Sequence, residues 1–270
     1  SVKEAVLGNT GKSIDRLGDN VIEIKRPKAR FEAIVKEYTR LSPEEQKNTV
    51  ILTAANKDRM KLNQDIRTEL KRQDSLADGK EFKVETAQGR SQVREFSAGD
   101  KIIFLQNDNR QGVKNGQTGI IDRIDGHKLT VTSGDKKLEI DLNQYKKIDH
   151  GYAMTTHKAQ GITVGRVLIQ MDSQQANMNN RNAYYVNISR AKYEVKVFTD
   201  NVKEMRNQVR DFARKLTSED FGPKKDEPKK TLSQHVEEAV KKMAQSIRFI
   251  KPPEIKAPVP TMKGPSGPSM

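Results

Sequence analysis

The feature that most constrains the fold is a change in hydrophobic period within the chain. Residues 29–80 contain two helical patterns on either side of the apolar, β-branched run NTVILTAAN, which is a strand-to-helix unit of the α/β kind. Residues 81–148 instead form short alternating segments separated by Gly, Asn and Asp turns, a pattern typical of antiparallel strands. The α/β pattern resumes over residues 149–216 with the apolar strands RVLIQM and YEVKVFTD. The sequence therefore predicts an α/β fold, a parallel sheet with helices on both faces, interrupted by a small antiparallel β-barrel of about five strands.

Two further segments flank this core. Residues 1–28 are predicted to be an N-terminal connecting segment, with a loose helical pattern followed by a short strand that ends at Pro27. Residues 217–270 contain a polar linker, an amphipathic helix and a Pro-rich stretch whose apolar content is too low for folding, so we expect a flexible, disordered tail. The apolar stripe of that helix consists of Leu232, Val236, Val240, Met243 and Ile247.

The charge balance favours a polyanionic partner. Fifty Lys and Arg residues stand against 36 Asp and Glu, which gives a formal net charge of +14. Because basic side chains that neutralise phosphates release condensed counterions, nucleic acid is the first candidate. The alternative is that the charge only keeps the protein apart from its neighbours in solution. No apolar run approaches the length of a membrane span and the first residues lack a signal-peptide core, so we expect a cytoplasmic protein with no membrane partner.

Two kinds of site are excluded or disfavoured by the sequence. The chain has no Cys, which excludes disulfides and thiolate metal sites, and its four His residues lie in no ligand spacing, so no metal site is predicted. The stretch GNTGKS, residues 8–13, is similar to a phosphate-binding P-loop, but the first Gly of that fingerprint falls on Val6 and no apolar strand precedes it. A helix break with a solvated Lys12 is therefore the preferred interpretation, and we do not expect this chain alone to hydrolyse ATP.

Two segments combine hydroxyls, a basic residue and a small residue in a way that packing alone does not require. These are TTHKAQG, residues 155–161, and YYVNISRAK, residues 184–192. Together with the strands around them they resemble the fifth and sixth conserved motifs of superfamily 1 helicases. The interrupting module, with GDKIIFLQND and GVKNGQTGIIDRID, resembles the Src-homology-type barrel inserted in the second RecA-like domain of the RecD-like, 5′-to-3′ branch. Over about residues 30–200 the chain is most similar to the C-terminal helicase of conjugative relaxases of the TraI/TrwC type.

The resemblance implies roles for eight residues. Arg190 matches the arginine finger, a catalytic and nucleotide-binding residue that stabilises charge on the transferred phosphoryl group. Gln160 and Gly161 match nucleotide-binding positions in the cleft between the two RecA-like domains. The positions that match contacts to single-stranded DNA are Thr53, Asn56, Thr156, His157 and Lys158.

Each of these roles has a structural alternative. Arg190 can be a surface residue at a helix terminus, and His157 can be a satisfied packing residue. Lys158 can be a solvated charge, and Asn56 can serve as a helix N-cap.

The resemblance implies the C-terminal half of an ATP-dependent 5′-to-3′ DNA helicase, within a bacterial relaxase that nicks, unwinds and transfers plasmid DNA. ATP and Mg²⁺ would be bound mainly by a first RecA-like domain of the same polypeptide, because this chain lacks a P-loop. The expected partners are single-stranded DNA, that first domain and proteins of a type IV secretion or conjugation system. The alternative is a non-enzymatic DNA-binding or secretion-system docking module derived from a helicase domain.

Overall fold

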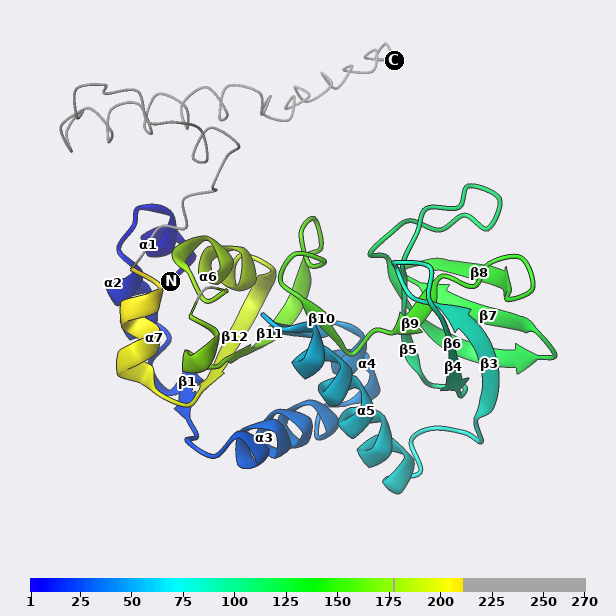
Figure 1. Ribbon diagram of the computed structural model, residues 1–270, viewed down its shortest axis with the longest axis horizontal. Coiled ribbons are helices and arrows are strands. Elements are labelled where there is room, and N and C mark those ends of the chain that lie inside the picture. The colour runs from blue at the N-terminus through cyan, green and yellow to red at the C-terminus, as the bar shows by residue number, and fades with distance from the viewer. Residues whose placement is uncertain (177, 211–270) are drawn as a thin grey trace, which may run out of the picture. The chain divides into compact units, whose positions relative to one another are not determined.

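The computed structural model describes residues 1–176 and 178–210, and their centre is a five-stranded sheet in which every pair of neighbours is parallel (Figure 1). This confirms the predicted α/β class. The strands, in sheet order, are β1 (Val21–Glu23), β12 (Ala191–Thr199), β11 (Val164–Met171), β2 (Thr49–Thr53) and β10 (Ala153–Thr155).

Helices cover both faces of this sheet, as the apolar strands predict. Successive residues of a strand face opposite sides, and in β11 the side chains of Val167 and Ile169 enter one apolar core whereas Leu168 enters another. The first core includes residues of α1 (Val2–Val6), α2 (Thr10–Asp15), α6 (Arg181–Ile188) and α7 (Val202–Gln208). The second includes residues of α3 (Pro27–Thr39) and α5 (Asn56–Arg72) (Figure 1).

The first 28 residues contribute a strand to the sheet and side chains to its core. β1 pairs in parallel with β12, Val21 opposite Val197, and forms one edge of the sheet. Ala5 of α1 and Ile14 of α2 are both buried in the first core. The sequence predicts the short strand itself but not its pairing, because its partner β12 lies far away in sequence and no local pattern indicates it.

The interrupting module contains seven antiparallel strands in two sheets, more than the five expected. One sheet has two strands, β3 (Lys80–Glu85) and β4 (Ser91–Phe96); the other has the order β8 (Lys136–Asp141), β7 (Lys128–Ser133), β6 (Thr118–Asp125), β5 (Lys101–Phe104) and β9 (Ile148–His150). Residues of both sheets, among them Phe82, Phe96 and Phe104, share one apolar core. We call the pair β3–β4 the ribbon.

Two local features add to the predicted order of elements. A short helix, α4 (Pro43–Lys47), precedes β2 and begins with a capping box formed by Ser42 and Glu45. The segment after β10 forms a turn in which the Ala159 N–H donates to the carbonyls of Thr155 and Thr156. The helix and tail predicted beyond residue 217 lie outside the described residues. Among the described residues, no helix combines the length and the apolar character needed to cross a membrane.

Candidate functional site

The candidate site lies where β2 and β10 end, at the carboxyl edge of the parallel sheet. Thr53 and Thr155 are opposite each other in register, and the Thr156 N–H donates to the Thr53 carbonyl across 3.0 Å. Ligands of open α/β sheets bind at this edge, outside the carboxyl ends of the strands. The fold therefore brings the segment TTHKAQG next to the start of α5, about 100 residues away in sequence.

The two predicted threonine contacts face inward. Thr53 is fully buried and its hydroxyl donates to the Ala55 carbonyl across 2.9 Å. Thr156 is 8% exposed and its hydroxyl lies 3.4 Å from the Thr53 carbonyl. Both hydroxyls thus stabilise the turns that leave the sheet, and neither is presented to a ligand in this conformation. Direct DNA contact through these two side chains stays a prediction.

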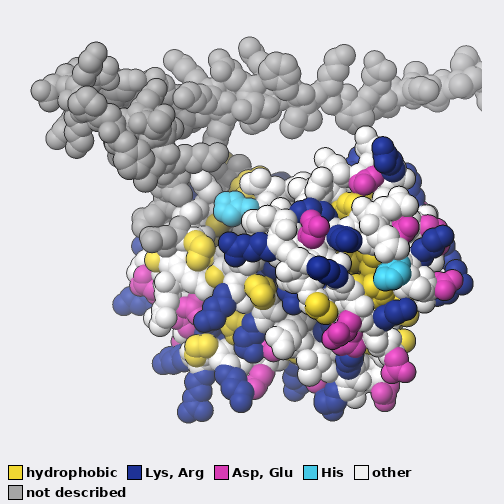
Figure 2. All heavy atoms as spheres, turned by 45° about the vertical axis from the view of Figure 1, so that its right-hand side comes forward, with side chains coloured by type: hydrophobic (Ala, Val, Ile, Leu, Met, Phe, Trp, Pro, Cys, Tyr) yellow, Lys and Arg dark blue, Asp and Glu magenta, His cyan; other side chains and the backbone are white. Residues whose placement is uncertain are grey.

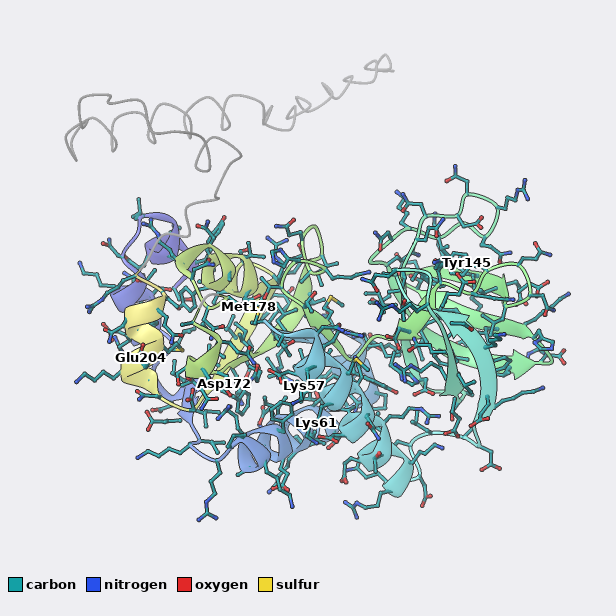
Figure 3. The ribbon with its side chains drawn as sticks, in the orientation of Figure 1. Lys57, Lys61, Tyr145, Asp172, Met178 and Glu204 are labelled. Carbon is teal, nitrogen blue, oxygen red and sulfur yellow. The ribbon has the colours of Figure 1, made fainter. Side chains whose placement is uncertain are left out.

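Asn56 is exposed at the start of α5 and is not its N-cap, so the N-cap alternative is wrong. The N-cap is Ala55, which offers no side-chain acceptor, whereas Asn56 accepts a hydrogen bond from Arg59 Nε across 2.7 Å. Lys57 and Lys61 lie one turn apart on the same helix (Figure 3). The first turn of α5 therefore combines a helix N-terminus without a side-chain cap with two basic residues, Lys57 and Arg59, and one acidic residue, Asp58.

His157, Gln160 and Gly161 lie on the exposed turn after β10. Gly161 has φ of +88°, and no heavy atom lies within 4 Å of the position that a Cβ would take. Its backbone conformation, rather than a close approach, is what requires glycine. Because His157 is exposed, the structure does not support the alternative in which it is a buried packing residue.

Lys158 lies on the same turn but is partly buried. Burial lowers the pKa of its ammonium group, and the neighbouring Arg59 lowers it further, while Asp149 acts in the opposite direction. A Cβ placed on Gly116 of the interrupting module would lie 3.7 Å from the Lys158 carbonyl oxygen. The module therefore packs against this turn and holds Lys158 in a basic cleft.

Arg190 follows α6 and its guanidinium is held by neutral acceptors. Nε donates to the Val186 carbonyl across 3.0 Å, Nη1 to the Ile162 carbonyl across 3.2 Å and Nη2 to the Ser189 hydroxyl across 2.8 Å. Among the described residues no carboxylate forms an ion pair with it. Since an arginine carries five N–H donors, these three bonds leave two for a further acceptor. Arg190 is thus both a helix-terminal residue, as the alternative predicts, and a cation whose charge no carboxylate neutralises.

A buried ion network that no local sequence pattern indicates joins α5 to the interrupting module. Arg67 donates from Nε to both oxygens of Asp100, at 3.0 and 3.1 Å, and from Nη1 to Glu95 across 2.9 Å. Asp100 is fully buried and also accepts from the Tyr152 hydroxyl across 2.7 Å. The pairing with Arg67, and then with Lys71, lowers the pKa of Glu95 to about 2. This network fixes the module against the helix whose first turn borders the candidate site.

The segment GNTGKS does not form a phosphate cradle. Lys12 lies inside α2, and the element before it is α1 rather than a strand. Within the parts of the chain that the structure describes, no three His, Cys, Asp or Glu side chains lie close enough together to hold a metal ion.

Residues 150–198, which include both β10 with its turn and α6 with Arg190, match the UvrD-like helicase C-terminal domain. The match spans β10, β11, α6 and β12, so the segment that is similar to the helicase domain coincides with four of the elements that build the parallel sheet and its covering helix.

Longer relatives of this helicase domain are conjugation proteins. The chain is 32% identical over 169 residues to a probable conjugal transfer protein TraA of Sinorhizobium fredii, which covers 60% of this chain and 15% of that protein. It is 26% identical over 271 residues to the multifunctional conjugation protein TraI of Escherichia coli, covering 74% of this chain and 15% of that protein. The chain therefore spans about 15% of the length of these relatives.

Among solved structures, a Bacteroides Pif1 helicase superposes on 76% of this chain and 49% of its own, with a TM-score of 0.45 and 15% identity.

Proposed function

We propose that the chain is the second RecA-like half of an ATP-driven DNA helicase, and that it acts within a longer conjugative relaxase-helicase that moves 5′ to 3′ along single-stranded DNA. ATP and Mg²⁺ would be bound mainly by a first RecA-like domain, which also brings the P-loop. In that arrangement Arg190 of this chain contacts the nucleotide, and the carboxyl edge of the sheet binds the single-stranded DNA.

The observation that carries the proposal is the state of Arg190. Its guanidinium is fixed by three neutral acceptors and keeps two N–H donors and its full charge available. A positively charged donor is what phosphoryl transfer requires opposite the γ-phosphate, because catalysis there depends on positioning and charge neutralisation. The bond from Nη1 to Ile162 also ties Arg190 to the turn that carries Gln160 and Gly161. Through this bond, single-stranded DNA bound at the turn would influence the position of the Arg190 guanidinium.

The DNA contacts in this proposal are Asn56, His157 and Lys158. All three lie at the carboxyl edge of the sheet, and Asn56 and Lys158 line one cleft. Amide, imidazole and ammonium groups at this edge can donate to phosphate oxygens, which position a strand without reading its sequence. Figure 2 shows Lys and Arg side chains across one face of the molecule, interspersed with acidic and hydrophobic ones.

The test is ATP turnover by the natural polypeptide extended N-terminally by about 250 residues, enough for one further domain. We expect turnover that single-stranded DNA accelerates, and we expect Arg190→Ala to lower it by about 10³-fold or more while leaving DNA affinity nearly unchanged. Arg16→Ala is the matched control, because Arg16 is an exposed arginine at the end of the N-terminal helices, and this variant should hydrolyse ATP at the wild-type rate.

Retention of turnover in Arg190→Ala would contradict the finger role. If the extended wild-type polypeptide binds DNA but never turns over ATP, the chain is instead a non-enzymatic DNA-binding module, and the helicase proposal is wrong.

A further inference from the structure

A second feature of the candidate site is a cleft of about 320 Å³ between the sheet edge and the interrupting module. Lys158 and the start of α5 form one wall, and the ribbon forms the other with Arg90, Gln92 and Arg94. Its volume lies at the lower end of the ~300–1,000 Å³ typical of small-molecule sites. The cleft is therefore large enough for one small ligand rather than for a folded partner.

The rim of the cleft is strongly basic. Arg59, Arg90, Arg94 and Lys158 line it against a single carboxylate, Asp149. Asp149 pairs with both Arg59, at 3.0 Å, and Arg94, at 3.3 Å. One carboxylate thus serves two guanidinium groups, and no described carboxylate forms an ion pair with Arg90 or Lys158. An anionic group at this rim would meet an excess of positive charge.

The inner part of the cleft is apolar but offers one unsatisfied donor. Ile103, Leu105 and Met154 contribute apolar surface from β5, the residue after it and β10. Gln92 Nε2 is buried and has no hydrogen-bond partner among the described residues, whereas Arg94 Nε faces Asp149 in the ion pair. A buried donor without a partner is destabilising, so a ligand that supplies an acceptor to Gln92 is favoured.

A flat, apolar group with acceptor atoms on its edge, attached to an anion, satisfies all of these features. This is the chemistry of a nucleotide. We infer that the cleft takes one nucleotide of a bound single strand, with the base turned between the ribbon and the sheet edge and its phosphates at Arg90 and Lys158. Gln92 then donates to an acceptor on the base. The inference rests on the proposed single-strand binding and adds the ribbon of the interrupting module to the DNA-binding surface.

The experiment compares two oligonucleotides of about a dozen units, within the range of site sizes for single-strand binding domains, by fluorescence anisotropy with this 270-residue chain. One is oligothymidylate and the other is an abasic strand with the same number of phosphates. We expect the wild-type chain to bind oligothymidylate about fivefold or more tighter, since an inserted base gains apolar burial in the cleft and a hydrogen bond from Gln92. Gln92→Leu keeps the size and the charge of the side chain. In this variant we expect the ratio of the affinities for oligothymidylate and the abasic strand to fall by about threefold or more.

Arg90→Ala separates the phosphate contact from the base contact. It should weaken both strands alike and reduce the slope of log affinity against log salt by about 0.7, the value for one phosphate on a single strand. Lys83→Ala is the matched control, because Lys83 is exposed on the same ribbon and does not line the cleft. Gln92→Glu, which places a negative charge in the cleft, should weaken both strands.

The outcomes distinguish the two proposals. If the wild-type chain binds neither strand, single-strand binding and the cleft assignment both fail. If it binds DNA and the ratio between the two strands is the same in Gln92→Leu as in wild type, only the cleft assignment is overturned. Far-UV circular dichroism and the thermal midpoint establish that each variant is folded before its affinity is interpreted.

Discussion

The Arg190 guanidinium donates to the Ile162 carbonyl across 3.2 Å, so one side chain joins the end of α6 to the segment that follows Gly161. The segment that carries Arg190 thus contacts the residue directly after the segment 155–161, although 28 residues separate the bonded pair in sequence. The contact gives Arg190 a structural role in addition to the catalytic one proposed.

The structural role of Arg190 predicts a measurable loss of stability. Arg190→Ala removes three hydrogen bonds from a charged donor. Because the guanidinium is only half-buried and can exchange these bonds for bonds to water, we expect a total loss of about 1–3 kcal/mol in the free energy of unfolding. Arg190→Lys should lose nearly as much, because an ammonium group cannot reach three acceptors arranged around a planar fork. Urea unfolding of the chain measures both. Unchanged stability in Arg190→Ala would show that the three bonds contribute nothing net.

The elements predicted best from the sequence are those whose buried residues recur at a regular spacing. β2 and β11 contain apolar runs covered on both faces, β12 has its apolar, buried residues in its second half, and the helices α3 and α5 carry their apolar residues at helical spacing. These patterns are local, so they can be read without knowing the fold. The same holds for the change to antiparallel strands near residue 81.

What sequence could not predict depends on distant partners or on side-chain direction. The split of the module into two sheets follows from which strands pair, and pairing is set by register over long separations. Arg67 and Asp100 are 33 residues apart and show no joint pattern. Thr53 matches a ligand-contacting position, yet its hydroxyl turns back to Ala55 because the chain bends immediately after β2.

The buried Arg67–Asp100 pair predicts a large effect from a single change. Arg67→Ala leaves the fully buried Asp100 carboxylate without its cation, and breaking one side of such a pair costs roughly 3–5 kcal/mol. The double variant Arg67→Met with Asp100→Leu should recover part of this loss, because neither charge of the pair then remains, although the Tyr152 hydroxyl and the Ser97 N–H lose their acceptor. Arg72→Ala, an exposed arginine paired with Glu69 on the same helix, is the control and should unfold at nearly the wild-type urea concentration. Equal midpoints for Arg67→Ala and Arg72→Ala would contradict the prediction.

Lys101 predicts a pH dependence of stability. Its ammonium group is buried and donates to the carbonyls of Gln46, Lys47 and Thr49, and burial lowers its pKa to about 7 from 10.5. Between these two values the unfolded chain binds more protons than the folded chain, so the contribution of Lys101 to the free energy of unfolding rises with pH. Below about pH 7 the buried group is charged in both states and this contribution is at its minimum.

The measurement is urea unfolding at about pH 6.5 and 9.5, on either side of most of that window. Methionine has a volume similar to that of lysine and no charge. We therefore expect Lys101→Met to lack the increase in the free energy of unfolding that the wild-type chain shows between these two pH values. Lys83→Met, an exposed lysine on the same module, should keep the wild-type dependence. If Lys101→Met kept the full wild-type increase in the free energy of unfolding with pH, groups other than Lys101 would be responsible for it.

Gly161 and Gly11 predict opposite responses to the same substitution. Gly161 has φ of +88°, where a Cβ meets no neighbour but strains the backbone, so Gly161→Ala should lower the free energy of unfolding by about 1 kcal/mol. Gly11 lies in α2 with no positive φ and open space around it, so Gly11→Ala should raise stability by about 0.5–1 kcal/mol. The pair controls for the added methyl group itself, because both sites have room for it. If Gly161→Ala were as stable as wild type, the turn that carries Gln160 would have to adopt a different conformation, and DNA affinity measured on the same variant would report whether that conformation still binds a strand.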